Sequence, residues 1–286
     1  MNLYITLFIV VIVGIILFAL YLLAIKPNDD EERRKALKPL EDRGVAHRGI
    51  FNNKGDAPEN SLLAYQRAVE YNVAFECDVH LTKDGKLAML HDPNLKRMCG
   101  VDIPMNELTY EEICQYRLKD SDQVIPLLDD VLEMVHGQVP IVLEIKPHGN
   151  YKETIVKVAE RMDAYEGFWV LESFHPSILR WFYKNRPEII RGQLSTDMFR
   201  NHLGKNLFEK IIITTLVTNF LVKPDFISYN YKHRRNIFYR LMRKLYRCGN
   251  AGWTFRSKKA VRKYGKRFDT IIFDGFIPKH LEKEHK

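Results

Sequence analysis

Short apolar runs with strand character alternate with amphipathic stretches of helical spacing from residue 45 to residue 273. Aromatic and β-branched residues recur over 74–82, and the Lys83-Asp84-Gly85 turn predicts that a strand ends there. Residues 86–90 predict a second short strand that returns toward the first. Further strands are predicted at 45–47, 141–145, 168–171, 189–194, 225–229, 251–255 and 270–273, and helices at 61–72, 151–165, 176–185, 207–221, 236–247 and 258–264.

This alternation predicts an α/β fold in which crossover helices join parallel strands. With 74–79 counted and 86–90 left aside, eight strands in about 240 residues fit a closed TIM (β/α)8 barrel. Residues 86–126 form an insertion after the second strand. A doubly wound open sheet is the alternative. The lack of a glycine-rich phosphate fingerprint after the first strand, and the polar residues at many strand ends, argue against it.

The first 25 residues carry no charged side chain, and residues 3–25 are almost wholly apolar. This length is sufficient for a helix to cross a hydrocarbon core of roughly 30 Å. A signal peptide would need a basic start and a small-residue cleavage site, which are not evident. We therefore predict that a transmembrane anchor at 1–25 and a charged tether at 26–43 precede the barrel domain at 44–286.

The distribution of basic residues around the apolar segment predicts its orientation. Apart from the terminal amine, nothing before the segment is basic. By the positive-inside rule, the protein is predicted to be a single-pass protein of the cell membrane with its domain in the cytoplasm. The basic residues that follow the segment are Lys26, Arg33, Arg34, Lys35, Lys38 and Arg43.

The formal net charge of +8 favours an anionic partner such as membrane phosphate, a phosphorylated small molecule or nucleic acid. No recognised motif supports nucleic-acid binding, so we expect no nucleic-acid partner. Hydrophobic residues make up 46% of the chain and charged residues 28%, which is typical of a folded globular protein. The four cysteines lack paired metal-site spacing and are expected to be reduced thiols.

Polar side chains stand at the carboxyl ends of the predicted strands, which converge at one mouth of a barrel. Side chains two apart on a strand share a face, so Glu76 and Asp78 point the same way, as do Glu144 and Lys146. Three carboxylates predict a site for Mg²⁺ or Ca²⁺ rather than for zinc. The residues at these strand ends are His47-Arg48, Glu76, Asp78, Glu144, Lys146, Ser173, Trp253-Thr254 and Asp274.

Two further groups complete the chemistry that these residues suggest. Arg48 and Lys146 are predicted to bind phosphate oxygens that the metal leaves free. His91 follows the return strand, and a histidine beside a carboxylate pair is a candidate acid or base.

Several motifs in this chain follow the order and spacing of a known enzyme family. They are His47-Arg48-Gly49, Pro58-Glu59-Asn60-Ser61, Phe75-Glu76-Cys77-Asp78-Val79, Leu81-Thr82-Lys83-Asp84-Gly85, His91-Asp92 and Leu143-Glu144-Ile145-Lys146. In these residues the chain resembles the glycerophosphodiester phosphodiesterases. The resemblance covers 44–278 and is most specific through residue 146. Where the family commonly has a small hydroxyl residue before its last aspartate, this chain has Phe273, so Asp274 is not assigned to the site.

The resemblance implies a TIM barrel that cleaves a phosphodiester with a divalent metal, Mg²⁺ or Ca²⁺. It implies that His47 and His91 form the general acid and base pair and that Glu76, Asp78 and Glu144 bind the metal. Arg48 and Lys146 are then expected to contact phosphate, and Trp253 is placed with the substrate-binding residues. Neither the order of proton transfers nor the choice of metal follows from the sequence.

The predicted function is metal-dependent hydrolysis of glycerophosphodiesters to glycerol 3-phosphate and an alcohol at a membrane-anchored barrel. The first alternative is lysophospholipase D activity on lysophospholipids, which the membrane anchor favours. The second is a catalytically inactive, membrane-tethered phosphate-binding or scaffold module. The complete set of two histidines and three carboxylates argues against the second alternative.

Two later stretches bear on the membrane. Residues 208–222 are apolar nearly all round and too short to span a bilayer, so they predict a buried helix or a lip that touches acyl chains. Residues 232–247 contain no acid, and their apolar positions lie on one helical face opposite basic ones. We expect that apolar face to pack on the barrel, with a basic face that could rest on anionic lipid.

Overall fold

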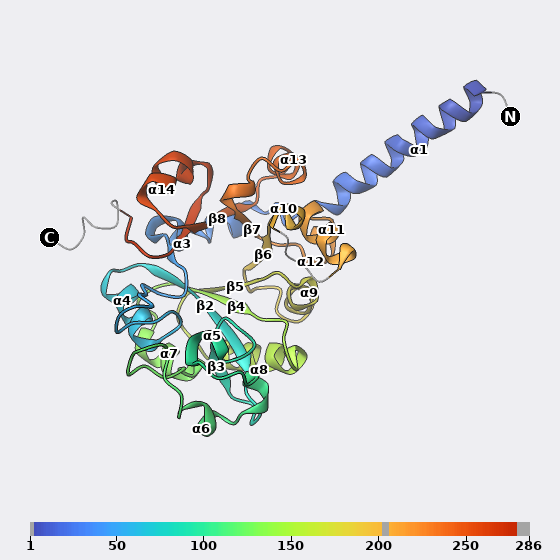
Figure 1. The fold of residues 1–286 in the computed structure, drawn as a ribbon. Coiled ribbons are helices and arrows are strands. Elements are labelled where there is room, and N and C mark those ends of the chain that lie inside the picture. The colour runs from blue at the N-terminus through green and yellow to red at the C-terminus, as the bar shows by residue number, and fades with distance from the viewer. Residues whose placement is uncertain (1–2, 202–205, 279–286) are drawn as a thin grey trace.

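Eight parallel strands close into a barrel in the computed structural model, which describes residues 3–201 and 206–278 (Figure 1). Strand β1 pairs with both β2 and β9, and this double pairing closes the sheet. The predicted TIM barrel is therefore confirmed. The barrel strands are β1 (Val45–Ala46), β2 (Ala74–Leu81), β4 (Ile141–Ile145), β5 (Trp169–Ser173), β6 (Arg191–Ser195), β7 (Phe226–Asn230), β8 (Gly249–Phe255) and β9 (Thr270–Phe273).

The insertion after the second barrel strand carries β3 (Leu87–Met89), which runs antiparallel to β2 and returns the chain to the barrel mouth. The insertion has a small apolar core of its own, to which Leu90, Met98 and Ile113 belong. This core fixes the position of the loop that holds His91. The helices here are α5 (Lys96–Cys99) and α6 (Tyr110–Ile113), with a 3₁₀ turn at Met105–Glu107, and α7 (Leu128–Val135) follows the insertion and packs in the main core.

Crossover helices surround the barrel at the predicted positions, to which the structure adds the short helix α10 (Met198–Asn201). The predicted helix at 207–221 is two helices, because the chain turns at Leu216, which has a left-handed φ of 60° and a buried side chain. The crossover helices are α4 (Leu62–Glu70), α8 (Tyr151–Asp163), α9 (Pro176–Asn185), α10 (Met198–Asn201), α11 (Leu207–Thr215), α12 (Asn219–Val222), α13 (Ile237–Leu245) and α14 (Lys258–Tyr264).

The segment predicted as a polar tether, 26–43, is folded against the barrel. It forms α2 (Glu31–Lys35) and α3 (Lys38–Arg43). Leu37 and Leu40 are 4% and 3% exposed and join the apolar cluster formed by the first residues of the strands, which fills the amino-terminal end of the barrel. Arg33 also pairs with the buried Asp225, at 2.6 Å between Nε and Oδ1. Leu37 and Leu40 are three residues apart, a helical spacing that could have predicted this packing, although most of the surrounding residues are charged.

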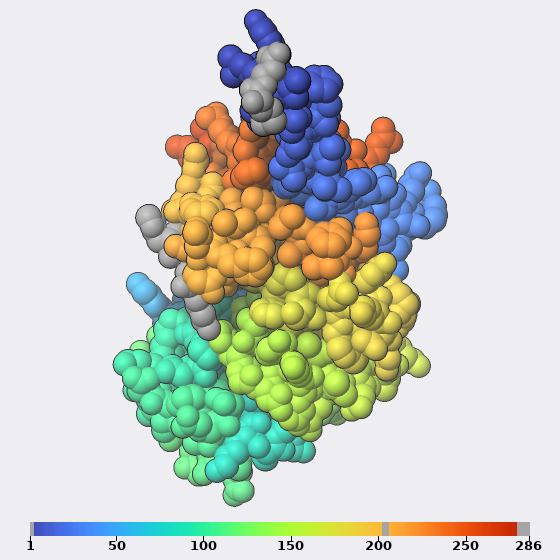
Figure 2. All heavy atoms as spheres, turned by 90° about the vertical axis from the view of Figure 1, so that its right-hand side faces the viewer, coloured from blue at the N-terminus to red at the C-terminus, as the bar shows by residue number. Residues whose placement is uncertain are grey.

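Helix α1 (Leu3–Ala24) projects from the barrel (Figures 1 and 2). Its length and composition would allow it to cross a membrane, and its apolar side chains are not buried against the rest of the protein. The division into anchor, tether and domain stays a prediction. The last residues of the predicted domain, 279–286, lie outside the described residues.

A fragment that starts at residue 44 is expected to be several kcal/mol less stable than one that starts at residue 21. It lacks Leu37 and Leu40, and losing a buried leucine side chain typically costs about 2–5 kcal/mol. Urea unfolding of the two fragments measures the difference. In the longer fragment, Leu40→Ala should reproduce much of the loss and Leu207→Ala, at an exposed position, should not. Equal midpoints for both fragments would show that 26–43 contributes nothing to the fold.

Candidate active site

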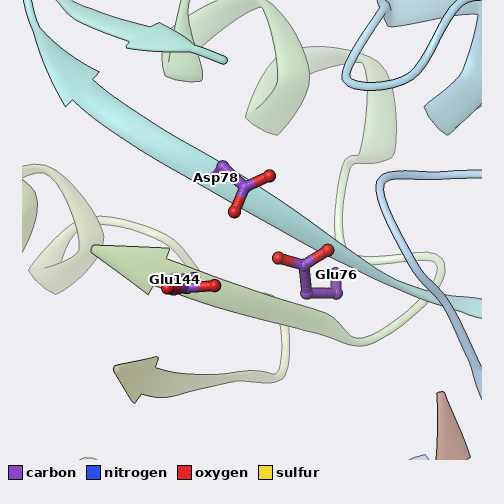
Figure 3. Close-up of side chains that lie close together, drawn as sticks. All are labelled: Glu76, Asp78 and Glu144. Atoms are coloured by element: carbon purple, nitrogen blue, oxygen red, sulfur yellow. The ribbon is translucent and has the colours of Figure 1, made fainter. Parts of the chain in front are cut away.

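Three buried carboxylates from two neighbouring strands face one another inside the barrel (Figure 3). Glu76 and Asp78 are two apart on β2, and Asp78 lies beside Glu144 of β4 in the strand register. One oxygen of each carboxylate lies within 4.8 Å of the others. The period of two along β2 and the parallel pairing with β4 therefore bring together the three acids that the sequence singled out.

The acidic cluster is only partly neutralised by cations. Lys146 Nζ lies 2.7 Å from Asp78 Oδ1 and 2.8 Å from Glu144 Oε2. Burial would raise the pKa of Asp78, but the neighbouring cations, Lys146 foremost, hold that pKa well below its usual value. Burial and the neighbouring carboxylates raise the pKa of Glu76 well above its usual value. Burial also raises the pKa of Glu144, although Lys146 opposes that shift.

This donor set fits a hard divalent cation. Three buried carboxylates offer only oxygen ligands, which Mg²⁺ and Ca²⁺ prefer and which do not match the nitrogen and sulfur sites typical of zinc. Burial is the first cause of the raised pKa values of Glu76 and Glu144, and repulsion from the neighbouring carboxylates adds to it. A bound cation would relieve this repulsion.

Each of the two predicted histidines has a carboxylate beside its Nδ1. His47 follows β1, and its Nδ1 lies 3.5 Å from Asp274 Oδ2, while its Nε2 lies 4.0 Å from Glu76 Oε2. His91 Nδ1 lies 2.6 Å from Asp92 Oδ1. Burial lowers the pKa of His47 to about 4 despite Asp274. His47 is therefore a neutral imidazole near pH 7.

Asp274 is a site neighbour that the sequence pattern did not assign. Residue 273 is not the small hydroxyl residue of the family pattern, but β9 pairs directly with β1 and so brings Asp274 beside His47. Arg256 Nε lies 3.1 Å from the same carboxylate oxygen, Asp274 Oδ2. Burial opposes ionisation of Asp274, yet His47 and Arg256 keep its pKa below its usual value.

The predicted phosphate ligand Arg48 belongs to a chain of ion pairs at the mouth. The Nη1 atom of Arg48 lies 2.5 Å from Glu59 Oε1, and the backbone N–H of Arg48 donates to Glu76 Oε2. Arg97 of the insertion bridges Glu59 to Asp92, at 2.7 and 2.6 Å. The Pro58-Glu59-Asn60-Ser61 motif pointed to Glu59, whereas nothing in the sequence marked Arg97. The pairs link Arg48 to the carboxylate that holds His91.

Local backbone geometry presents the His47-Arg48-Gly49 segment to the acids. Arg48 has φ 59° and Gly49 has φ 82°, both in the left-handed region. A Cβ at Gly49 would lie 2.7 Å from the backbone of Ala64, so only glycine fits at this close approach. Asn60 links this segment to the acids, because its backbone N–H donates to the Arg48 carbonyl and its side-chain amide donates to Asp78 Oδ2 at 2.8 Å.

Trp253 and Ser173, two further predicted residues, are held by structural contacts. Trp253 on β8 donates from its indole N–H to the Ser228 carbonyl and meets the Phe174 ring edge-on at 5.7 Å. Ser173 donates to the Ile145 carbonyl, which is a structural hydrogen bond. Trp253 is therefore held in one orientation, with its side chain only partly buried.

Two buried groups that the sequence did not assign lie next to the site. Glu172 lies beside Glu144 in the strand register, and burial followed by the Glu144 charge raises its pKa to about 8. His80 Nε2 lies 3.2 Å from the His91 carbonyl oxygen, so this histidine supports the loop of the other. Two signals could have pointed to them: His80 lies two residues after Asp78 on the same strand, and Glu172 lies on the strand next to that of Glu144.

The profile of the Glycerophosphoryl diester phosphodiesterase family matches residues 47–207, more than half of the chain. The chain belongs to this family. It is 32% identical over 165 residues to a glycerophosphodiester phosphodiesterase of Bacillus altitudinis, with 54% of this chain and 66% of the relative covered. It is 32% identical over 160 residues to the human lysophospholipase D, with 51% and 49% covered. These alignments span less than two thirds of each relative.

Solved structures of phosphodiesterases share the barrel of this family member. A phosphodiesterase of Oleispira antarctica, solved with sn-glycerol-3-phosphate, aligns with a TM-score of 0.64 at 20% identity over 81% of this chain and 92% of its own. The glycerophosphodiester phosphodiesterase of Thermotoga maritima aligns with a TM-score of 0.60 at 24% identity over 81% and 94%. At these identities the likeness establishes the fold.

Proposed function

We propose that this protein hydrolyses glycerophosphodiesters to glycerol 3-phosphate and an alcohol. The observation that carries the proposal is the buried cluster of Glu76, Asp78 and Glu144 at the barrel mouth, with His47 beside it. A module that only binds phosphate has no need of three buried carboxylates that a single lysine neutralises only in part. Family membership and the names of the relatives support the same reaction.

The proposed metal ligands are Glu76, Asp78 and Glu144. A divalent cation held there, Mg²⁺ or Ca²⁺, would supply Lewis-acid polarisation of a phosphoryl oxygen. Arg48 and Lys146 are proposed to contact the remaining phosphate oxygens, since both cations already lie beside the acids. Trp253 is proposed to line the substrate site with its half-buried ring.

His47 and His91 are proposed to exchange protons with the substrate. The lowered pKa of His47 favours it as the proton acceptor, because a neutral imidazole accepts a proton from the nucleophile. His91 is then the donor to the leaving alkoxide. Asp274 and Asp92 occupy the two Nδ1 positions and orient the rings, which leaves Nε2 of each ring for the transfer.

Lysophospholipase D activity is the second candidate, and two observations favour it. Relatives at 32–34% identity are lysophospholipases D. An apolar helix joined to the barrel would keep the site close to lipid. This reaction cleaves the same type of phosphodiester bond and yields a lysophosphatidic acid plus an alcohol.

The fragment 21–286 is expected to hydrolyse glycerophosphocholine or lysophosphatidylcholine in a reaction that EDTA stops and added Mg²⁺ or Ca²⁺ restores. The preferred substrate separates the two candidate activities, because lysophosphatidylcholine carries an acyl chain and glycerophosphocholine does not. Release of choline and of the phosphate product measures turnover. Folded, metal-loaded protein that cleaves neither substrate would favour the inactive phosphate-binding module.

We also propose that residues 1–25 anchor the protein in the cell membrane with the domain in the cytoplasm. The support is the exposed apolar helix α1 and the basic residues that follow it. A protease added outside intact cells should leave the domain uncut and should cleave it only after the cells are permeabilised. Cleavage of the domain in intact cells would show that it lies outside the cell, which contradicts the proposed orientation.

A further inference from the structure

The root of α1 is fixed to the barrel rather than joined to it by a free linker. Tyr21 donates from its hydroxyl to the Thr215 carbonyl at the end of α11, and its ring meets Phe238 of α13 edge-on at 5.9 Å. The Tyr246 hydroxyl donates to the Leu22 carbonyl, and Ile25 is fully buried. Helices α11 and α13 therefore lie beside the point where α1 leaves the barrel (Figure 1).

Exposed apolar side chains gather on the same helices. Of the nine large apolar side chains that are exposed outside α1 in the described residues, six belong to α11, α12 and α13. We call these six the root surface: Leu207 (65% exposed), Phe208 (73%), Ile211 (43%), Phe220 (48%), Ile237 (71%) and Leu245 (45%). Figure 2 shows the chain of these helices, in shades of orange, next to the root of α1. Clusters of this kind on a soluble surface mark an interaction site.

Helix α13 differs from the expectation that its whole apolar face packs on the barrel. Met242 and Tyr239 are buried, but Ile237 and Leu245 remain exposed. Positions 237, 241 and 245 form a stripe along the helix on the side of Phe238, which contacts α1. Ile237 and Leu245, at the two ends of this stripe, are exposed, while Leu241 between them is partly buried against the barrel core.

A basic hollow lies along α13 next to this stripe, because Ile237 and Leu241 are among its lining residues. It has a volume of about 620 Å³ and is lined by Arg240, Arg243, Lys244 and, from the segment before β9, Arg267. Arg240, Lys244 and Arg267 are exposed. Within the ranges 3–201 and 206–278, no ion pair is formed by these three side chains. An apolar stripe beside a basic one is the pattern of a helix that lies in a membrane interface.

We propose that the root surface rests on an anionic lipid leaflet, with its apolar side chains among the acyl chains and the basic residues of α13 at the phosphate headgroups. This inference depends on the proposed anchoring by α1. The occupant is a lipid surface because the six apolar side chains belong to helices next to α1, which among the described residues is the segment long and apolar enough to cross a bilayer, and because basic side chains lie beside them on α13. The fixed root then holds the barrel in one orientation on the membrane.

The test uses the full chain reconstituted into vesicles of three parts phosphatidylcholine to one part phosphatidylserine, with brominated acyl chains as the quencher. Ile237→Trp places a tryptophan on the root surface, and Val156→Trp places one at an exposed position of α8, away from α1. The three native tryptophans are common to both variants. We expect brominated lipid to quench the added tryptophan of Ile237→Trp several-fold more strongly than that of Val156→Trp.

The charge requirement is tested in the Ile237→Trp background. Arg240→Gln with Lys244→Gln should remove the part of the quenching that depends on phosphatidylserine, whereas Lys83→Gln with Lys152→Gln should preserve it. Co-flotation with the vesicles and hydrolysis of a soluble glycerophosphodiester are measured in parallel. Protein that co-floats and hydrolyses but is quenched equally at both positions overturns the root-surface proposal alone. Protein that does not co-float overturns both this proposal and the anchor.

Discussion

Glu76→Gln is expected to abolish hydrolysis while making the metal-free protein more stable. Glu76 is a proposed metal ligand, and a metal contributes several kcal/mol to such a transition state, so turnover should fall by about three orders of magnitude. The same change removes a carboxyl group whose ionised form is opposed first by burial and then by repulsion from Asp78 and Glu144. Relief of that repulsion is expected to add about 1–2 kcal/mol to the free energy of unfolding in EDTA.

Steady-state turnover and urea unfolding, each with and without metal, measure these two effects. Metal should stabilise the wild-type protein against unfolding and should do so much less for Glu76→Gln, because ligand binding stabilises only a protein that retains the site. A variant that keeps metal-dependent turnover would remove Glu76 from the proposed site.

Glu172→Gln is the matched control, because it also replaces a buried carboxyl group by its amide but lies outside the cluster of three. It should keep turnover. Its wild-type pKa is raised from 4.5 to about 8, so the folded protein binds this proton more tightly than the unfolded chain. The stability that this group contributes is fully present below about pH 4.5 and is lost as the pH rises toward 8. Glu172→Gln should flatten this decline.

His47→Gln is expected to lower kcat/KM by about 10²–10⁴, the usual contribution of a positioned acid or base. His136→Asn, an exposed position at the end of α7, should have no effect. Loss of activity without loss of metal-induced stabilisation would assign His47 to proton transfer rather than to metal binding. Turnover near the wild-type rate in His47→Gln would exclude it as the acceptor.

The pH profile distinguishes a proton acceptor from a structural histidine. With its pKa lowered to about 4, His47 stays neutral well below the ordinary value of 6.5, so the acid limb of kcat/KM should lie below pH 6.5. Asp274 raises the pKa of His47, and Asp274→Asn should therefore move that limb to still lower pH. An acid limb that Asp274→Asn leaves unchanged would show that His47 does not set it.

Local sequence patterns determined the barrel, the acids and the apolar helix. Alternating strands and helices predicted the fold, and the period of two along a strand was enough to place Glu76 and Asp78 on one face. An uninterrupted apolar run predicted α1. Each of these patterns lies within one strand or helix, so it can be recognised from neighbouring residues in the sequence alone.

Only the tertiary structure decided which distant residues meet. Closure of the barrel puts β9 beside β1 and so places Asp274 next to His47, although more than two hundred residues separate them in the chain. The fold of the insertion brings Arg97 to Glu59, and the packing of the segment before β1 buries Leu37 and Leu40 at the far end of the barrel. The same packing leaves Ile237 exposed beside the root of α1. These contacts depend on the register and closure of the whole sheet, which no local periodicity specifies.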